Sequence, residues 1–243
     1  MIRNLRATGR LIRILWVSLA GIIEWFACCG RRATAREKVL WMQRMSRRFL
    51  KAIRCEVAVR GTPPESGMLV CNHIGFVDIL VIGSTVPCLF VAKSDVKSWP
   101  VFGMLTRLAG TIFVSRRRQP ALAAEMGELR KALRCGLPVV VFPEGTSSDG
   151  RSVLQFRSSL LGAVEGTSQA ITPAAISYSS EAAGYWGDMV FVFQLWRMVC
   201  EPGFSAGLVF GEPLPDPGDR KRTARSLQAA VVALHRSPFT TEK

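Results

Sequence analysis

MLVCNHIGFVDILVI, the stretch from Met68 to Ile82, sets a histidine and an aspartate between two short apolar runs. His73 and Asp78 are five residues apart, in a segment that predicts a strand, a loop and a helix. A carboxylate bonded to one imidazole nitrogen fixes the tautomer and stabilises the cation formed when the other nitrogen takes a proton. The stretch therefore predicts an oriented general base. No serine nucleophile lies beside it, so we expect an alcohol of the substrate to be the nucleophile.

Two alternatives stay open for this stretch. His73 could be a structural histidine packed among apolar residues, although the chain has only two histidines and a second polar loop, Phe142–Thr146 (FPEGT), also follows an apolar run. Cys71 could pair with His73 and carry an acyl group, because residues two apart in a strand share a face.

Outward from this stretch, strand-like apolar runs alternate with helical segments. Strands are expected at Val57–Val59, Met68–Cys71, Leu89–Ala92, Thr111–Val114, Pro138–Phe142, Ala170–Ser177 and Gly207–Phe210. Helices are expected at Asp78–Ser84, Pro100–Leu108, Pro120–Arg134, Ser158–Val164 and Arg222–His235. The alternation predicts an α/β fold over residues 55–237, with a mixed, largely parallel sheet flanked by helices, and a frayed tail at 238–243.

Residues 1–54 are expected to form N-terminal helices that anchor the chain to a membrane. The apolar segment Ile14–Gly30 would make a helix of about 25 Å, short of a hydrocarbon core of about 30 Å. Whether it crosses the bilayer or lies in one leaflet stays open. A basic amphipathic helix is expected directly after it, over Arg36–Arg54, and is typical of a membrane surface.

The charge distribution favours an anionic membrane over nucleic acid as the partner. The net charge is +14, and residues 1–60 hold 14 Lys and Arg against 3 Asp and Glu, beside the most apolar segment. No nucleic-acid-binding motif is visible. Seven cysteines form no disulfide or metal-ligand pattern, which indicates a reducing compartment and no metal site. We therefore expect the protein at the cytoplasmic face of the inner or plasma membrane.

Four blocks of the sequence together resemble the glycerolipid acyltransferase family, typified by 1-acylglycerol-3-phosphate acyltransferase. They span about residues 65–215 and are His73 to Asp78, Gly110 to Arg116, Phe142 to Thr146, and Ile171 to Ala175. The resemblance implies that a fatty acyl group moves from acyl-CoA or acyl carrier protein, as co-substrate, to the hydroxyl of a lysolipid. The simplest acceptor is 1-acylglycerol-3-phosphate, which gives phosphatidic acid. No cofactor is implied.

The resemblance also implies roles for individual residues. His73 would be the base and Asp78 would hold it. Arg116 would bind the phosphate of the acceptor, and the main-chain N–H of Gly145 could face a phosphate or the oxyanion. The full set of substrate-binding residues implied is Arg116, Glu144, Gly145, Thr146, Lys93 and Arg157.

One position departs from the family pattern. Its third block usually continues with an arginine, where this chain has Ser147. The loss of a phosphate ligand leaves other acceptors open, among them lyso-ornithine lipid and other lysophospholipids. A non-catalytic membrane lipid-binding protein is the alternative from another class.

Overall fold

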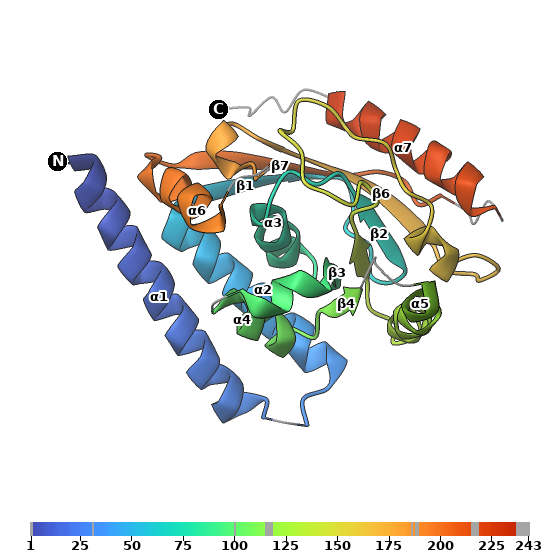
Figure 1. Ribbon diagram of the computed structural model, residues 1–243, viewed down its shortest axis with the longest axis horizontal. Coiled ribbons are helices and arrows are strands. Elements are labelled where there is room, and N and C mark those ends of the chain that lie inside the picture. The colour runs from blue at the N-terminus through green and yellow to red at the C-terminus, as the bar shows by residue number, and fades with distance from the viewer. Residues whose placement is uncertain are drawn as a thin grey trace.

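A mixed sheet organises the computed structural model, which describes residues 2–30, 32–99, 101–114, 119–185, 187, 190–214 and 219–236. Figure 1 shows the sheet with helices on both sides. Its strands, in the spatial order β1-β7-β6-β2-β5-β3-β4, number seven in the described part of the chain. They are β1 (Cys55–Arg60), β2 (Met68–Cys71), β3 (Leu89–Lys93), β4 (Ile112–Val114), β5 (Val139–Val141), β6 (Ile171–Tyr178) and β7 (Phe204–Phe210). The helices are α1 (Ile2–Cys28), α2 (Ala35–Ile53), α3 (Val77–Thr85), α4 (Phe102–Leu108), α5 (Gln119–Leu133), α6 (Phe191–Cys200) and α7 (Arg220–Arg236).

The strand directions bring the polar loops to one edge of the sheet. Strands β6, β2, β5, β3 and β4 pair in parallel, and β7 runs antiparallel to β6 and parallel to β1. The carboxyl ends of β2, β5 and β6 therefore share an edge with the amino ends of β1 and β7. This arrangement confirms the predicted mixed, largely parallel sheet.

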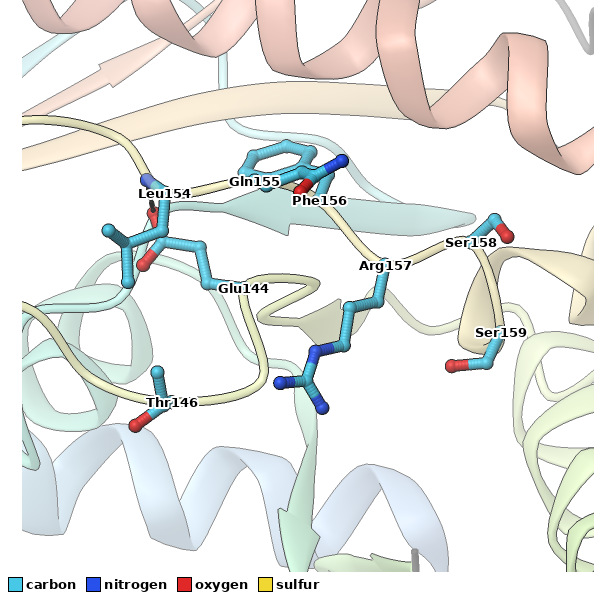
Figure 2. Close-up of a pocket in the computed structure, with 8 residues that line it drawn as sticks. All are labelled: Glu144, Thr146, Leu154, Gln155, Phe156, Arg157, Ser158 and Ser159. Atoms are coloured by element: carbon cyan, nitrogen blue, oxygen red, sulfur yellow. Dashed lines mark hydrogen bonds between the residues drawn. The ribbon is translucent and has the colours of Figure 1, made fainter.

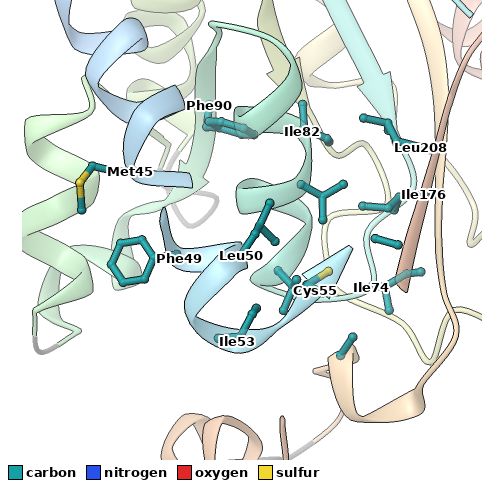
Figure 3. Close-up of a cluster of buried hydrophobic side chains, with 14 of the residues drawn as sticks. Met45, Phe49, Leu50, Ile53, Cys55, Ile74, Ile82, Phe90, Ile176 and Leu208 are labelled. Carbon is teal, nitrogen blue, oxygen red and sulfur yellow. The ribbon is translucent and has the colours of Figure 1, made fainter. Parts of the chain in front are cut away.

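Each face of the sheet has its own hydrophobic core. Along β2, Leu69 and Cys71 belong to one core and Met68 and Val70 to the other, as the alternation of side chains along a strand requires. Helices α1, α2, α3 and α6 cover the first face, and α5 and α7 cover the second (Figure 1). Figure 3 shows the first core, where side chains of α2 such as Leu50 pack towards the sheet.

Helix α1 lies against the rest of the molecule along most of its length. The indole Nε1 of Trp41 donates to the carbonyl oxygen of Gly21 at 3.1 Å, and a side chain on Gly21 would overlap Met45. Glu24 forms ion pairs with two arginines of α2, Arg44 (2.9 Å) and Arg48. The carboxylate of Glu24, which interrupts the apolar segment, is thus neutralised by arginines of α2. Helix α1 and α2 share one hydrophobic core with the sheet.

Three elements differ from the expectation. Helix α1 begins at Ile2, well before the predicted start at Ile14, and is therefore longer than the expected segment Ile14–Gly30. Ser158–Val164 is not an α-helix: only a short 3₁₀ helix, η2 (Leu160–Ala163), forms there, because two serines and Gly162 weaken helix propensity. Helix α6 was not predicted. Its outward positions, Val192, Phe193 and Trp196, are apolar, so the sequence lacks the polar stripe that marks an ordinary surface helix. The predicted tail 238–243 lies outside the described residues.

Candidate active site

The predicted histidine and aspartate meet at the carboxyl end of β2. His73 Nδ1 and Asp78 Oδ2 are 2.7 Å apart. The carboxylate is fully buried, whereas 22% of the histidine side chain is exposed. Because Nδ1 is occupied by the carboxylate, Nε2 is the nitrogen left to exchange a proton with a substrate. The pair has the geometry of an oriented general base.

Asp78 is held by donors on both of its oxygens. Oδ2 also accepts the main-chain N–H groups of Ile74 (2.7 Å) and Gly75 (3.0 Å), and Oδ1 accepts the hydroxyl of Tyr178 at 2.7 Å. Burial, together with the charge of Asp78, raises the pKa of Tyr178 well above its usual value, so the phenol remains a donor. Four donors converge on one carboxylate and leave it little freedom to turn away from His73.

The loop after β2 is anchored to β6 by Asn72. Its side-chain amide donates to the carbonyl oxygen of Ile176 (3.1 Å) and accepts the N–H of the same residue (2.8 Å). Asn72 therefore substitutes for strand pairing where β2 has ended but β6 continues. Because His73 follows directly, these two bonds fix where the loop begins.

The loop at the end of β5 packs against His73. The rings of His73 and Phe142 stack with centroids 4.3 Å apart. The main-chain N–H and the hydroxyl of Ser148 both donate to the carbonyl oxygen of His73, at 2.9 and 3.1 Å. The first and third blocks of the sequence therefore form one structural unit.

Gly145 has a positive φ of 75°, which favours glycine. Its N–H donates to the carbonyl oxygen of Phe142 at 3.2 Å and closes the turn. This bond engages the N–H within the turn, so the expectation that it faces a phosphate or an oxyanion stays a prediction. Gly145 shapes the turn that presents Glu144.

Glu144 is buried, with one oxygen in use. Oε1 accepts the N–H of Leu154 at 3.1 Å, while Oε2 is buried and has no hydrogen-bond partner among the residues that the structure describes. Burial raises the pKa of Glu144 to about 7, partly opposed by the N–H groups of Leu154 and His73. A buried carboxyl oxygen without a partner is costly, which indicates a place for a hydrogen-bond donor.

Glu144 lines a cavity of about 610 Å³ together with Thr146 and Arg157. Figure 2 shows the Arg157 side chain extending from segment 154–159 towards the turn that carries Glu144. The N–H of Arg157 donates to the carbonyl oxygen of Pro143 at 2.9 Å. Three predicted substrate-binding residues thus share one cavity, beside the loop that contacts His73.

Of the two other side chains predicted to bind substrate, one lies elsewhere on the sheet edge and one lies outside the described residues. Lys93 is exposed at the carboxyl end of β3, on the same sheet edge, but does not line the Glu144 cavity. Arg116 lies outside the described residues.

Cys71 does not have the properties of a nucleophile. Its side chain is fully buried, and burial raises the pKa of the thiol well above its usual value. The alternative of a Cys–His pair is therefore not supported.

Sequence reasoning missed Tyr178 and an aromatic cluster near the loop. Phe191 of α6 contacts the rings of Trp99, Phe76 and Phe102, with centroids 4.7, 5.2 and 5.2 Å away. Phe191 is far from the other three in the sequence, and no local pattern predicts the contacts.

Comparisons with known proteins agree with this geometry. A family model described as acyltransferase matches residues 34–177. The lyso-ornithine lipid O-acyltransferase of Pseudomonas aeruginosa is 32% identical over 241 residues, which cover 95% of this chain and 92% of that protein. The 1-acyl-sn-glycerol-3-phosphate acyltransferase of Neisseria meningitidis is 29% identical over 163 residues, covering 64% of each chain.

The fold is shared with a solved structure. The crystal structure of the 1-acyl-sn-glycerophosphate acyltransferase from Thermotoga maritima matches with a TM-score of 0.68, over 96% of each chain and at 18% identity.

Proposed function

This chain belongs to the acyltransferase family, and from that premise we propose that His73 and Asp78 catalyse transfer of a fatty acyl group from a thioester to the free hydroxyl of a lysolipid. The observation that carries this assignment is the 2.7 Å contact between His73 and the buried Asp78, with the imidazole still accessible. Family membership sets aside the alternative of a non-catalytic lipid-binding protein.

The reaction proceeds in two proton transfers through His73. Nε2 takes the hydroxyl proton as the oxygen attacks the thioester carbonyl, and a carbon–oxygen bond forms. The tetrahedral intermediate then collapses, the carbon–sulfur bond breaks, and the imidazolium returns the proton to the departing thiolate. Asp78 stabilises the imidazolium between the two steps. The thioester is already activated, so positioning the alcohol supplies much of the rest.

Glu144 and Arg157 are proposed to hold the acceptor. The unpartnered Oε2 of Glu144 accepts a hydrogen bond from a polar group of the lysolipid, and Arg157 supplies a cation in the lining of the same cavity. Thr146 lines the cavity and adds a hydroxyl.

The acceptor we propose first is a lyso-ornithine lipid. The relative that matches almost the whole chain carries that activity in its name, as do relatives from Rhodobacter capsulatus and Brucella abortus. This chain has Ser147 where the family pattern has a phosphate-binding arginine. The loss of that arginine favours a headgroup other than phosphate. The second candidate is 1-acylglycerol-3-phosphate, the acceptor named for the Neisseria meningitidis relative, and the cation of Arg157 suits its phosphate.

Membrane association is proposed through α1 and α6. Helix α1 is long and apolar enough to cross a membrane by length and composition. It is nevertheless docked on the protein from Arg10 to Trp25, which leaves an outward apolar stripe that includes Trp16 and Ile23. We propose that this stripe lies in one leaflet, with exposed apolar residues of α6 such as Phe193 beside it.

The cytoplasmic face is proposed from the cysteines. All seven are free, and Cys55, Cys71 and Cys88 are buried as small apolar residues. Acyl-CoA or acyl carrier protein would supply the acyl group from that side.

The test is acyl transfer from a labelled acyl donor to a panel of lysolipids by the purified full chain. We expect ester product with lyso-ornithine lipid and a slower reaction with 1-acylglycerol-3-phosphate. The reverse preference would replace the first acceptor by the second. Hydrolysis of the donor without ester product, for every lysolipid, would overturn the proposed function.

A further inference from the structure

A second cavity, of about 980 Å³, lies apart from Glu144 and is strongly basic. Four of its lining residues are cations and one, Glu56, is a carboxylate. The cations are Arg13 of α1 and Arg47, Lys51 and Arg54 from the C-terminal end of α2. Within the described part of the chain, none of the four has an ion-pair partner.

The lining cations belong to two groups of basic residues, one at the end of α2 and one on α1. Arg47 and Lys51 are four residues apart and share one side of α2, and Arg54 caps the C-terminal end of the same helix. Arg6, Arg10 and Arg13 are spaced by four and three residues on α1. Like charges at this spacing repel one another and destabilise a helix. An anion bound in the cavity would reduce that cost.

Arg10 contacts Pro202, one of the residues that line the cavity. Its buried guanidinium donates to the carbonyl oxygens of Val199 (3.0 Å), Pro202 (2.8 Å) and Glu201, which ties α1 to the turn between α6 and β7. These bonds go to neutral carbonyl groups, and burial, followed by the charges of Arg54, Arg6 and Arg13, lowers the pKa of Arg10. With Glu56 as the carboxylate in the lining against four cations, the cavity keeps an excess of positive charge.

The cavity lies at the same edge of the sheet as His73 and beside α1. Its lining includes Ser179 and Phe204, at the carboxyl end of β6 and the amino end of β7. Ser179 follows Tyr178, which holds Asp78. On α1, Arg13 directly follows Ile12, a member of the exposed apolar stripe.

We propose that this cavity binds the phosphate of an anionic phospholipid headgroup, separately from the acceptor site at Glu144. Arginine suits phosphate because its planar guanidinium donates two parallel hydrogen bonds. The neighbouring apolar stripe points to a lipid of the bilayer as the source of the phosphate. A headgroup bound there would turn the edge that carries His73 towards the membrane. The inference rests on the proposed membrane association.

The test compares two triple variants of the full chain. The cavity variant is Arg13→Gln, Lys51→Gln and Arg54→Gln. The control is Lys131→Gln, Arg134→Gln and Arg225→Gln, which removes the same charge from exposed positions. Lys131 lies on α5, Arg134 directly follows α5, and Arg225 lies on α7. Binding is measured to vesicles of phosphatidylcholine alone and with phosphatidylglycerol. Thermal unfolding checks the fold, and the KM for the acyl donor is measured in neutral detergent.

The wild type should bind phosphatidylglycerol vesicles at least tenfold more tightly than neutral ones. The cavity variant should lose that preference and the control should keep most of it, with the donor KM within about threefold in both. Equal losses in the two variants would reduce the effect to general charge attraction and overturn the inference. A raised donor KM in the cavity variant, with or without weaker vesicle binding, would assign the cavity to donor phosphates and also overturn it. A wild type that binds neither vesicle would instead overturn the proposed membrane association.

Discussion

The hydroxyl of Tyr178 donates a hydrogen bond to Asp78 Oδ1 at 2.7 Å, although 100 residues separate the two. This contact reaches the carboxylate from β6, on the opposite oxygen from His73. It makes Tyr178 a positioning residue, since it acts on the base only through Asp78.

Replacing Tyr178 by Phe should lower kcat about tenfold and leave the KM values for both substrates nearly unchanged. The variant removes one donor from a buried carboxylate, a bond of about 1.5–3 kcal/mol, but no substrate contact. Steady-state kinetics checks this, with Tyr185→Phe as the matched control in a chain that has two tyrosines. A rise in KM with kcat unchanged would contradict the positioning role.

Glu144 should make stability fall as pH rises from about 4.5 to 7. Its pKa is about 7 in the folded protein and 4.5 for the ordinary group, so the folded state binds the proton more tightly. The resulting stabilisation is full below pH 4.5 and is lost as pH rises through 7, a change of about 3 kcal/mol.

Glu144→Gln has no such titration. Denaturant unfolding at several pH values measures the free energy of unfolding of both proteins. As pH rises, the variant should become more stable relative to the wild type. Contributions of other carboxyls cancel in this difference. A difference that is constant from pH 4.5 to 7 would show that the pKa of Glu144 is not raised.

Asn72→Ala should destabilise the fold by about 2–4 kcal/mol. The substitution leaves the buried N–H and carbonyl groups of Ile176 without partners, each at a cost of about 1–3 kcal/mol. Chemical denaturation measures the loss, and Asn4→Ala, at an exposed position of α1, should change stability little. Equal stability of both variants would mean that Asn72 does not anchor the loop.

The double substitution Trp16→Glu and Ile23→Glu should lower the affinity of the protein for vesicles at least tenfold. Both side chains are exposed on α1, at 69% and 60%, and apolar burial of such side chains contributes about 1.5–3 kcal/mol each. Ser226→Glu with Ala229→Glu adds the same charge on α7, on the other face of the sheet, and should bind like the wild type. If cosedimentation with vesicles is weakened equally in both double variants, the α1 surface is not the membrane-binding surface.

The parts of the fold that local patterns determine were predicted well. The strand before His73 and the helix carrying Asp78 follow from apolar runs and a short loop, and the structure joins the two side chains as expected. Tyr178 could not be found this way, because its role depends on the pairing of β2 with β6. Glu144 was identified only through a family pattern, since a Pro-Glu-Gly turn alone does not reveal that one carboxyl oxygen is buried without a partner.

Helix α6 shows a different limit. Its outward residues are apolar, so the periodicity of a soluble helix is absent, and only packing against α1 and the sheet reveals the element. The sequence also does not reveal the hydrogen bond from the Gly145 N–H to Phe142, because that bond forms only when the turn closes.

The central claim is tested most directly by the turnover of His73→Ala with a labelled acyl donor and lysolipid, beside His235→Ala, the other histidine of the chain. We expect His73→Ala to lower kcat by about a hundred- to ten-thousand-fold while folding and vesicle binding persist, and His235→Ala to remain active. A His73→Ala protein that forms ester at nearly the wild-type rate would show that this imidazole is not the base.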